Sequence, residues 1–174
     1  MTALSRPAVA VVTPESLALL DRHLGNSGIP DMHQQRFKVQ MDGAGLYLAA
    51  WRDDAPVGYV LLHFKHPPHH ASYEHYPACA YVEALDVREA SRRQGFAVAL
   101  MDAAEAQALA RGAAFVGLSV GVDNTPARGL YRKLGYQPTE LPDYWVSWTY
   151  LDRDTGEPME EGETCSFWIK RLTK

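Results

Sequence analysis

The chain has 174 residues, of which 47% are hydrophobic and 22% are charged, as in an ordinary globular protein with an adequate core. Its formal net charge is -4 and it contains no basic block, which argues against nucleic acid and anionic membranes as partners. Only Cys79 and Cys165 are present, too few for a disulfide framework, although a single bridge between them stays possible.

The first half of the chain predicts two helices and a hairpin of strands. Residues 8–13 form a short β-branched run, which is followed by a Thr-Pro pair that is typical of a helix start over residues 14–24. Residues 31–41 predict a second, weakly amphipathic helix. Residues 45–52 and 56–65 are apolar segments with a short polar turn between them, so they predict an antiparallel hairpin.

Residues 66–80 have no hydrophobic periodicity and contain three prolines, so we expect a loop that is solvated or lines a binding site. The loop also carries four histidines: His66, His69, His70 and His75. Their spacing matches no regular set of metal ligands, and no cysteine or carboxylate cluster completes a tetrahedral site apart from Glu74. We therefore expect no metal.

Residues 81–87 carry apolar side chains on both faces, as expected of an interior strand. A polar stretch follows, and a helix rich in small residues is predicted over residues 95–111. The free N–H groups at such a helix start, beside a pair of arginines, favour an anion. Glu83 is the unusual residue here, because it places a carboxylate within an interior strand.

The second half of the chain predicts a crossover and another hairpin. Residues 113–120 predict a strand, which would lie parallel to the one before the helix, through a right-handed crossover. Residues 123–135 predict a helix with one buried face, and residues 144–151 and 164–172 predict the last two strands, joined by an acidic loop. No internal repeat, linker, signal-peptide core or membrane-length apolar run is present, so we expect one cytoplasmic domain over residues 1–174.

Two motifs occur in this order along the chain. The first is Arg92-x-x-Gly95-x-Ala97, and the second is Asn124-x-x-Ala127-x-x-Leu130-Tyr131-x-x-Leu134-Gly135-Tyr136. Each alone is weak, but together, with a hairpin before and after them, they are specific. On these motifs the chain resembles the GCN5-related N-acetyltransferase (GNAT) superfamily. The resemblance implies an α/β fold with a mixed, mostly antiparallel sheet of about six to seven strands, about four helices, and a parallel, splayed strand pair at the cofactor site.

The resemblance also implies an acetyl donor, acetyl-coenzyme A (acetyl-CoA), whose pyrophosphate the first motif would bind. Gly95 and Ala97 leave backbone N–H groups open at the positive end of the helix, and the neighbouring arginines can add charge-assisted contacts. The backbone N–H near Val87 is the group that the superfamily uses to polarise the thioester carbonyl. The residues assigned to acetyl-CoA are Leu85, Val87, Arg92, Arg93, Gln94, Gly95, Phe96, Ala97, Asn124, Ala127 and Tyr131.

Two residues are candidates for catalysis of acetyl transfer. Glu83 lies where many members that acetylate small amines carry a carboxylate, and it would act as a base, through a water, or would only bind the cationic amine. Tyr131 would return a proton to the leaving thiolate, or would simply fill the core. Asn124 would hold the pantetheine or acetyl end, or would only cap its helix.

The acceptor is read from the variable parts of the chain. A small primary amine is the leading class, such as a polyamine, an aminoglycoside-like compound or an amino-acid derivative. The alternatives are a protein or peptide acceptor, at an N-terminus or lysine, and a non-catalytic acetyl-CoA sensor; a homodimer is possible. Candidate aromatic walls are Tyr73, Tyr76, Tyr144, Trp145 and Trp148, although the shared strand face of Tyr144, Val146, Trp148 and Tyr150 is more typical of a core.

Overall fold

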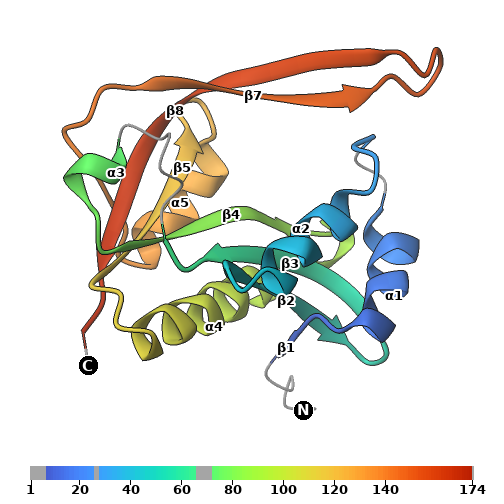
Figure 1. Cartoon of the computed structure of the whole chain (residues 1–174), viewed down its shortest axis with the longest axis horizontal. Helices are drawn as coiled ribbons and strands as arrows, with labels where there is room; N and C mark the ends of the chain where they lie inside the picture. The colour runs from blue at the N-terminus through green and yellow to red at the C-terminus, as the bar shows by residue number, and fades with distance from the viewer. Residues whose placement is uncertain (1–6, 26–27, 66–71, 174) are drawn as a thin grey trace.

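The structure, a computed structural model, describes residues 7–25, 28–65 and 72–173. Within these residues one sheet of eight strands runs in the order β1-β2-β3-β4-β5-β8-β6, with β7 paired to β8 (Figure 1). The strands are Ala8–Val11 (β1), Gly45–Arg52 (β2), Ala55–His63 (β3), Cys79–Val87 (β4), Phe115–Gly121 (β5), Gln137–Pro138 (β6), Tyr144–Leu151 (β7) and Pro158–Arg171 (β8). The helices are Pro14–Leu24 (α1), Met32–Met41 (α2), Ser72–His75 (α3), Phe96–Ala110 (α4) and Thr125–Lys133 (α5), with a 3-10 turn at Glu89–Ser91.

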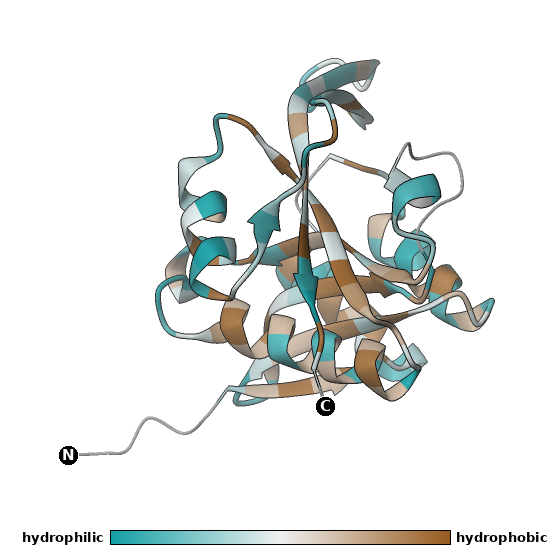
Figure 2. Cartoon of the chain, turned by 90° about the vertical axis from the view of Figure 1, so that its left-hand side faces the viewer, coloured by the Kyte–Doolittle hydropathy of each residue, from teal (hydrophilic) through white to brown (hydrophobic). Residues whose placement is uncertain are grey.

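The helices cover both faces of the sheet. Helix α4 packs on β2, β3 and β4 from one side, whereas α1 contacts β3 and α2 contacts β2 from the other (Figure 1). Strand alternation divides the side chains between these two cores: Val60 and Leu62 face α4, while Tyr59 and Leu61 face α1 and α2. In Figure 2 the strands in the body of the molecule are largely hydrophobic, and the outer turns are largely hydrophilic.

The predicted helices form where their end signals lie. At the start of α1 the Thr13 side chain accepts the Ser16 amide and Ser16 in turn accepts the Thr13 amide, a capping box with Pro14 in the first helical position. Asn124 caps α5 in the same manner, by accepting the Ala127 amide. The predicted hairpin of β2 and β3 and the parallel pair of β4 and β5 are confirmed.

The acidic loop predicted between the last two strands is shorter than expected. Strand β8 begins at Pro158, so Glu160, Glu161 and Glu163 are strand residues, and pairing with β7 outweighs the low strand propensity of glutamate. The sheet also has more strands than predicted, because β6 is a two-residue strand with too little sequence to be recognised. A short helix, α3, lies within the predicted loop over residues 66–80, and residues 66–71 lie outside the described part of the chain.

The aromatic face of β7 is not a core, contrary to the prediction from its alternation. The β7–β8 hairpin projects from the body of the sheet (Figure 1), and Tyr144, Val146 and Tyr150 are only half-buried. Trp148 on the same face is 38% exposed, and Trp145 on the opposite face is 65% exposed. Alternation alone shows that a strand has two faces, but not whether another element covers one of them.

The two cysteines are buried and free. Cys79 pairs with Phe115 and Cys165 pairs with Gly121, and these partners are six residues apart on β5. That places the cysteines about 20 Å apart, far beyond the reach of a disulfide. No described helix is long and apolar enough to cross a membrane.

Candidate active site

Strand β4 carries a β-bulge in its middle. Leu61 of β3 faces Glu83, but Tyr59, two residues away, faces Asp86, so β4 has one residue more than its partner strand. Ala84 takes up the extra length with a left-handed backbone, φ 56°, which is unfavourable for a residue with a side chain. The bulge therefore sets the direction of the Glu83 side chain.

Strands β4 and β5 separate beside this bulge. They pair only from Cys79 with Phe115 to Val82 with Leu118, and β5 continues to pair with β8 as far as Gly121. The edge of β4 that faces β5 is consequently unpaired from Glu83 onward. This opening between the two strands, here called the β4–β5 gap, is the splayed parallel pair that the resemblance implied.

The backbone of Val87 faces the β4–β5 gap. The Arg88 amide donates to the Val57 carbonyl at 2.8 Å while Val87 lies opposite Gly58, so the N–H and C=O of Val87 point away from β3. The Val87 carbonyl accepts a hydrogen bond from Arg92 Nε at 2.8 Å, whereas the Val87 amide faces the β4–β5 gap. Gly58 makes this approach possible, because a Cβ there would lie 2.7 Å from the Asp86 carbonyl oxygen.

A group of backbone amides at the start of α4, here called the amide cradle, follows along the chain. Gly95 has φ 87° and Arg93 has φ 63°, and this turn brings the chain into the helix. The first helical bond is from the Ala99 amide to the Gly95 carbonyl, so the amides of Phe96, Ala97 and Val98 have no partner within the helix. These N–H groups, together with the helix dipole, suit an anionic group such as a phosphate.

The side chains around this cradle divide into two kinds. Phe96 is buried, and Arg52 lies over its ring at 4.9 Å while donating to the Gln94 side chain, so these residues hold the loop in place. Arg92 is bound to the loop through Val87 and, at 3.6 Å, through Asp86. Arg93 is exposed and is the arginine with the greater freedom to reach a phosphate.

Helix α5 brings Tyr131 to the core on the far side of the gap. Tyr131 is 8% exposed, and its ring packs edge-on against Tyr136 at 5.8 Å. Its hydroxyl makes no hydrogen bond to another described residue. Burial, with a smaller contribution from Tyr81, raises the pKa of Tyr131 to about 12, so the phenol is protonated at neutral pH and can act as a donor. Leu85 lies half-buried against the same core.

A network of side chains links three strands near the gap. The Tyr81 hydroxyl lies 2.7 Å from Ser119 Oγ, which lies 2.6 Å from the Tyr144 hydroxyl, so β4, β5 and β7 are joined. Burial raises the pKa of Tyr81 to about 12. Sequence reasoning missed Ser119, since nothing in a small residue within an apolar strand indicates two tyrosine partners.

Glu83 has a partner that sequence reasoning also missed, His63 at the end of β3. His63 Nε2 lies 2.8 Å from Glu83 Oε2. The hydrogen bond from His63, which outweighs desolvation, lowers the pKa of the Glu83 carboxyl, and the charges of His63 and Arg36 act in the same direction. The only signal for the pair is the hairpin register, in which His63 faces Tyr81, two residues before Glu83.

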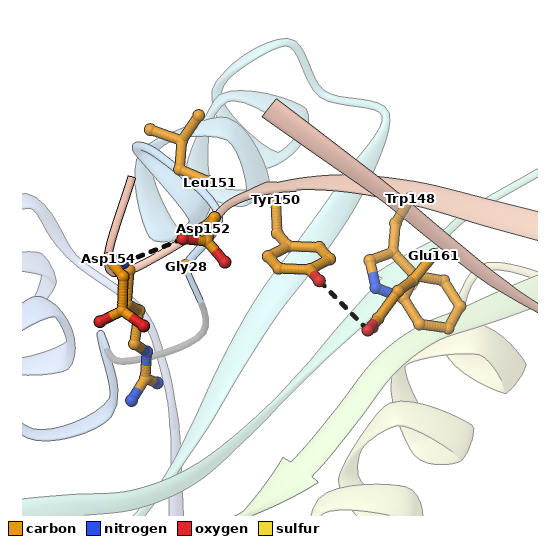
Figure 3. A pocket seen from close by; sticks show the side chains of 8 residues that line it. Gly28, Trp148, Tyr150, Leu151, Asp152, Asp154 and Glu161 are labelled. Carbon is orange, nitrogen blue, oxygen red and sulfur yellow. Dashed lines mark hydrogen bonds between the residues drawn. The ribbon is translucent and has the colours of Figure 1, made fainter. Parts of the chain in front are cut away.

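The tip of the β7–β8 hairpin meets the loop between α1 and α2. The Leu151 amide donates to the Gly28 carbonyl at 2.8 Å, beside a cavity of about 350 Å³ (Figure 3). Aromatic and acidic side chains line this cavity together with Arg153, and its three carboxylates outnumber that one guanidinium. The Tyr150 hydroxyl donates to Glu161 at 3.3 Å. The main members are Trp148, Tyr150, Asp152, Asp154 and Glu161. Such a lining suits a cation, which is attracted to carboxylates and to aromatic faces.

The five predicted aromatic walls do not gather in one place. Trp148 lines the hairpin cavity and Tyr144 joins the Ser119 network, whereas Trp145 points to solvent. Tyr76 packs on Phe115 at 6.1 Å and so belongs to another part of the sheet. The side chain of Tyr73 lies outside the described residues, as do three of the loop histidines. Among the residues that the structure describes, no group of three His, Cys, Asp or Glu is placed to hold a metal.

Comparisons with known proteins agree with this geometry. The model of the acetyltransferase (GNAT) family matches residues 17–136. A curated aminoglycoside 2'-N-acetyltransferase from Mycolicibacterium fortuitum is 48% identical over 64 residues, which are 37% of this chain and 31% of that protein. The matched stretch thus spans about a third of the relative's length.

Solved acetyltransferase structures share the fold. The ribosomal-protein-S18-alanine N-acetyltransferase of Escherichia coli has a TM-score of 0.65 and 15% identity, covering 97% of this chain and 95% of that one. A phosphinothricin acetyltransferase from Sinorhizobium meliloti, in complex with acetyl-CoA, has a TM-score of 0.67 and 13% identity, covering 95% and 88%. At these identities the likeness concerns the fold.

Proposed function

Because the chain belongs to the acetyltransferase (GNAT) family, we propose that it transfers the acetyl group of acetyl-CoA to a primary amine of a small molecule, by direct attack in a ternary complex. The observation that carries the proposal is the β4–β5 gap. An amide cradle lies at the start of α4, the Val87 amide faces the gap, and Glu83 lies where the two strands part.

The donor side follows from the physical chemistry of the cradle. The amides of Phe96, Ala97 and Val98 suit the pyrophosphate of acetyl-CoA, and Gly95 leaves them uncovered. Arg93 adds charge, while Arg92 and Gln94 stabilise the loop. Further along β4, the unpaired edge at Leu85 and Val87 offers backbone groups to the amide-containing pantetheine arm.

The chemistry needs three contributions from the protein. The amine nitrogen attacks the thioester carbonyl, the C–N bond forms and the C–S bond breaks. The Val87 amide stabilises the developing oxyanion, and Tyr131 returns a proton to the thiolate. Glu83 meets the acceptor, either as the base that removes its proton or as the carboxylate that binds its ammonium. Asn124 caps α5 with its side-chain oxygen, so its amide nitrogen is the group left for the donor.

A small cationic acceptor is supported by the hairpin cavity. Its carboxylates and aromatic rings suit a second positive charge on the same molecule, as in a polyamine or aminoglycoside. The relative named for aminoglycoside acetylation points in the same direction. A peptide acceptor would need room along an extended groove instead, and a pure acetyl-CoA sensor would need neither Glu83 nor Tyr131.

The test is an acceptor screen that follows thiol release. Cys79 and Cys165 are buried, and burial raises the pKa of Cys79 to about 12 and that of Cys165 to about 11, so the protein's own thiols are protonated at the pH of the assay. We expect coenzyme A release with polyamines and aminoglycosides, and acetylated products by mass spectrometry. Release with peptides alone would overturn the small-molecule acceptor, and release with no amine would overturn the enzyme.

A further inference from the structure

His63 and Glu83 form a pair at the entrance to the β4–β5 gap. They lie on the sheet face that α1 and α2 cover, since Leu61 faces Glu83 and His63 faces Tyr81 across the β3–β4 hairpin. Nε2 of His63 and Oε2 of Glu83 are 2.8 Å apart. The Glu83 side chain is 48% exposed and that of His63 is 17% exposed, so the carboxylate is the more accessible member.

The hydrogen-bonding roles within the pair follow from the charge of Glu83. An ionised carboxylate only accepts, so Nε2 of His63 must carry the hydrogen and donate it to Oε2. The other carboxylate oxygen, Oε1, makes no hydrogen bond to a described residue. As a hydrogen-bond donor, His63 therefore orients Glu83 and leaves the second carboxylate oxygen available to a ligand.

We propose that His63 is the positioning residue of the acceptor site: it donates a hydrogen bond to Glu83 and so orients the carboxylate that binds the cationic amine. This deepens the proposed function and rests on it. It assigns Glu83 the binding role, so the bound ammonium releases its proton to solvent water before its nitrogen attacks the thioester. A carboxyl whose pKa is lowered is a poor base toward an ammonium group, but a good binder of it.

Two other titratable groups near the pair keep one charge state around neutral pH. On β4 the pair faces Tyr81, which is uncharged below pH 10 because burial raises its pKa to about 12. On α2 it is near Arg36, whose guanidinium stays charged. The negative charge that the pair offers to a ligand is therefore that of the Glu83 carboxylate.

The experiment compares the KM for a polyamine at pH 8 in the wild type, His63→Gln and His63→Leu. Glutamine can donate a hydrogen bond from its amide to Glu83, whereas leucine cannot. An alkyl amine with a pKa near 10 is cationic at this pH. Acetyl-CoA affinity and thermal unfolding are measured alongside, to show that each variant is folded.

In His63→Gln we expect the KM to stay within about twofold of the wild-type value, and in His63→Leu we expect it to rise roughly tenfold. A wild-type KM in His63→Leu, or a KM in His63→Gln as high as that in His63→Leu, would overturn the proposal.

A second measurement needs no turnover and so separates this inference from the proposed function. In a carboxyl-carbon NMR titration the pKa of Glu83 should be below its ordinary value in the wild type and should return upward in His63→Leu. If the pKa of Glu83 were the same in the wild type and in His63→Leu, the role of His63 would be refuted, even for an active enzyme. A protein that acetylates no amine but shows the titration would refute the function alone.

Discussion

The hydroxyl of Tyr81 lies 2.7 Å from Ser119 Oγ, at the level where the backbone pairing between β4 and β5 ends. This side-chain hydrogen bond thus links β4 to β5 next to the last residues that the two strands pair through their backbones. Ser119 also reaches the Tyr144 hydroxyl at 2.6 Å, so the same oxygen attaches the projecting hairpin. The Ser119 hydroxyl therefore joins β4, β5 and β7 beside the β4–β5 gap.

Ser119→Ala removes one hydrogen bond from each of the two tyrosines. We expect the free energy of unfolding to fall by about 1 to 3 kcal/mol, measured by urea denaturation, because buried hydroxyls lose a partner. Ser147→Ala is the matched control, since Ser147 is an exposed residue of β7, and its effect should be within about 0.5 kcal/mol. Equal effects of the two substitutions would show that the network contributes nothing.

Gly95→Ala tests the amide cradle. Alanine disfavours the φ of 87° at Gly95, so both the stability and the orientation of the α4 amides should suffer. Gly112→Ala is matched, because Gly112 has φ 82° at the other end of α4 and open space around it. Each substitution should cost about 1 kcal/mol of stability, but only Gly95→Ala should weaken acetyl-CoA binding, roughly tenfold by calorimetry. The same affinity in both variants would place the pyrophosphate elsewhere.

Glu161→Gln tests the hairpin cavity as a subsite for a second ammonium. Glu161 faces Trp148 across the hairpin and lines the cavity, whereas its neighbour Glu160 faces Thr149 and points to the other side. For a diamine we expect Glu161→Gln to raise the KM roughly fivefold and Glu160→Gln to leave it within about twofold. A monoamine should not distinguish the variants. Equal shifts for the diamine would mean that only net charge matters.

The buried tyrosines predict the response of stability to alkaline pH. Burial raises the pKa of Tyr81 and Tyr131 to about 12 and that of Tyr136 and Tyr144 still further, whereas tyrosines in the unfolded chain ionise near pH 10. The unfolded state therefore loses protons first. The stability contribution of these neutral side chains is complete below about pH 10 and is lost as the pH rises toward 12. Urea unfolding at pH 8, 10 and 11 should show a falling midpoint, and a constant midpoint would contradict the burial of these phenols.

The sequence predicts the strands and helices well because their signals are local. Residues 14–24 carry a cap, a proline and a leucine repeat, and residues 95–111 begin at a glycine and carry an apolar stripe. The glutamate-rich start of β8 was missed because its strand conformation depends on pairing with β7, a contact that composition does not reveal. The exposure of the β7 aromatics was missed for the same reason.

The candidate site was predictable only in part. Gly95 and the cap at Asn124 are local, and the structure places them as expected at helix starts. The bulge at Ala84 and the pairing of His63 with Glu83 depend on the register between strands, which shifts by one residue within the hairpin. No spacing along the chain encodes that shift, so the partner of Glu83 could be found only in three dimensions.

The most direct measurement of acetyl transfer at the β4–β5 gap compares Glu83→Gln and Tyr131→Phe with the wild type, by acetyl-CoA calorimetry and by the rate of product formation. Both variants should bind acetyl-CoA as the wild type does, and both should acetylate the best amine of the screen at least about tenfold more slowly. Tyr76→Phe, the same change at a tyrosine outside the site, should keep the wild-type rate. Wild-type rates in Glu83→Gln and Tyr131→Phe would contradict the assignment of the reaction to this gap.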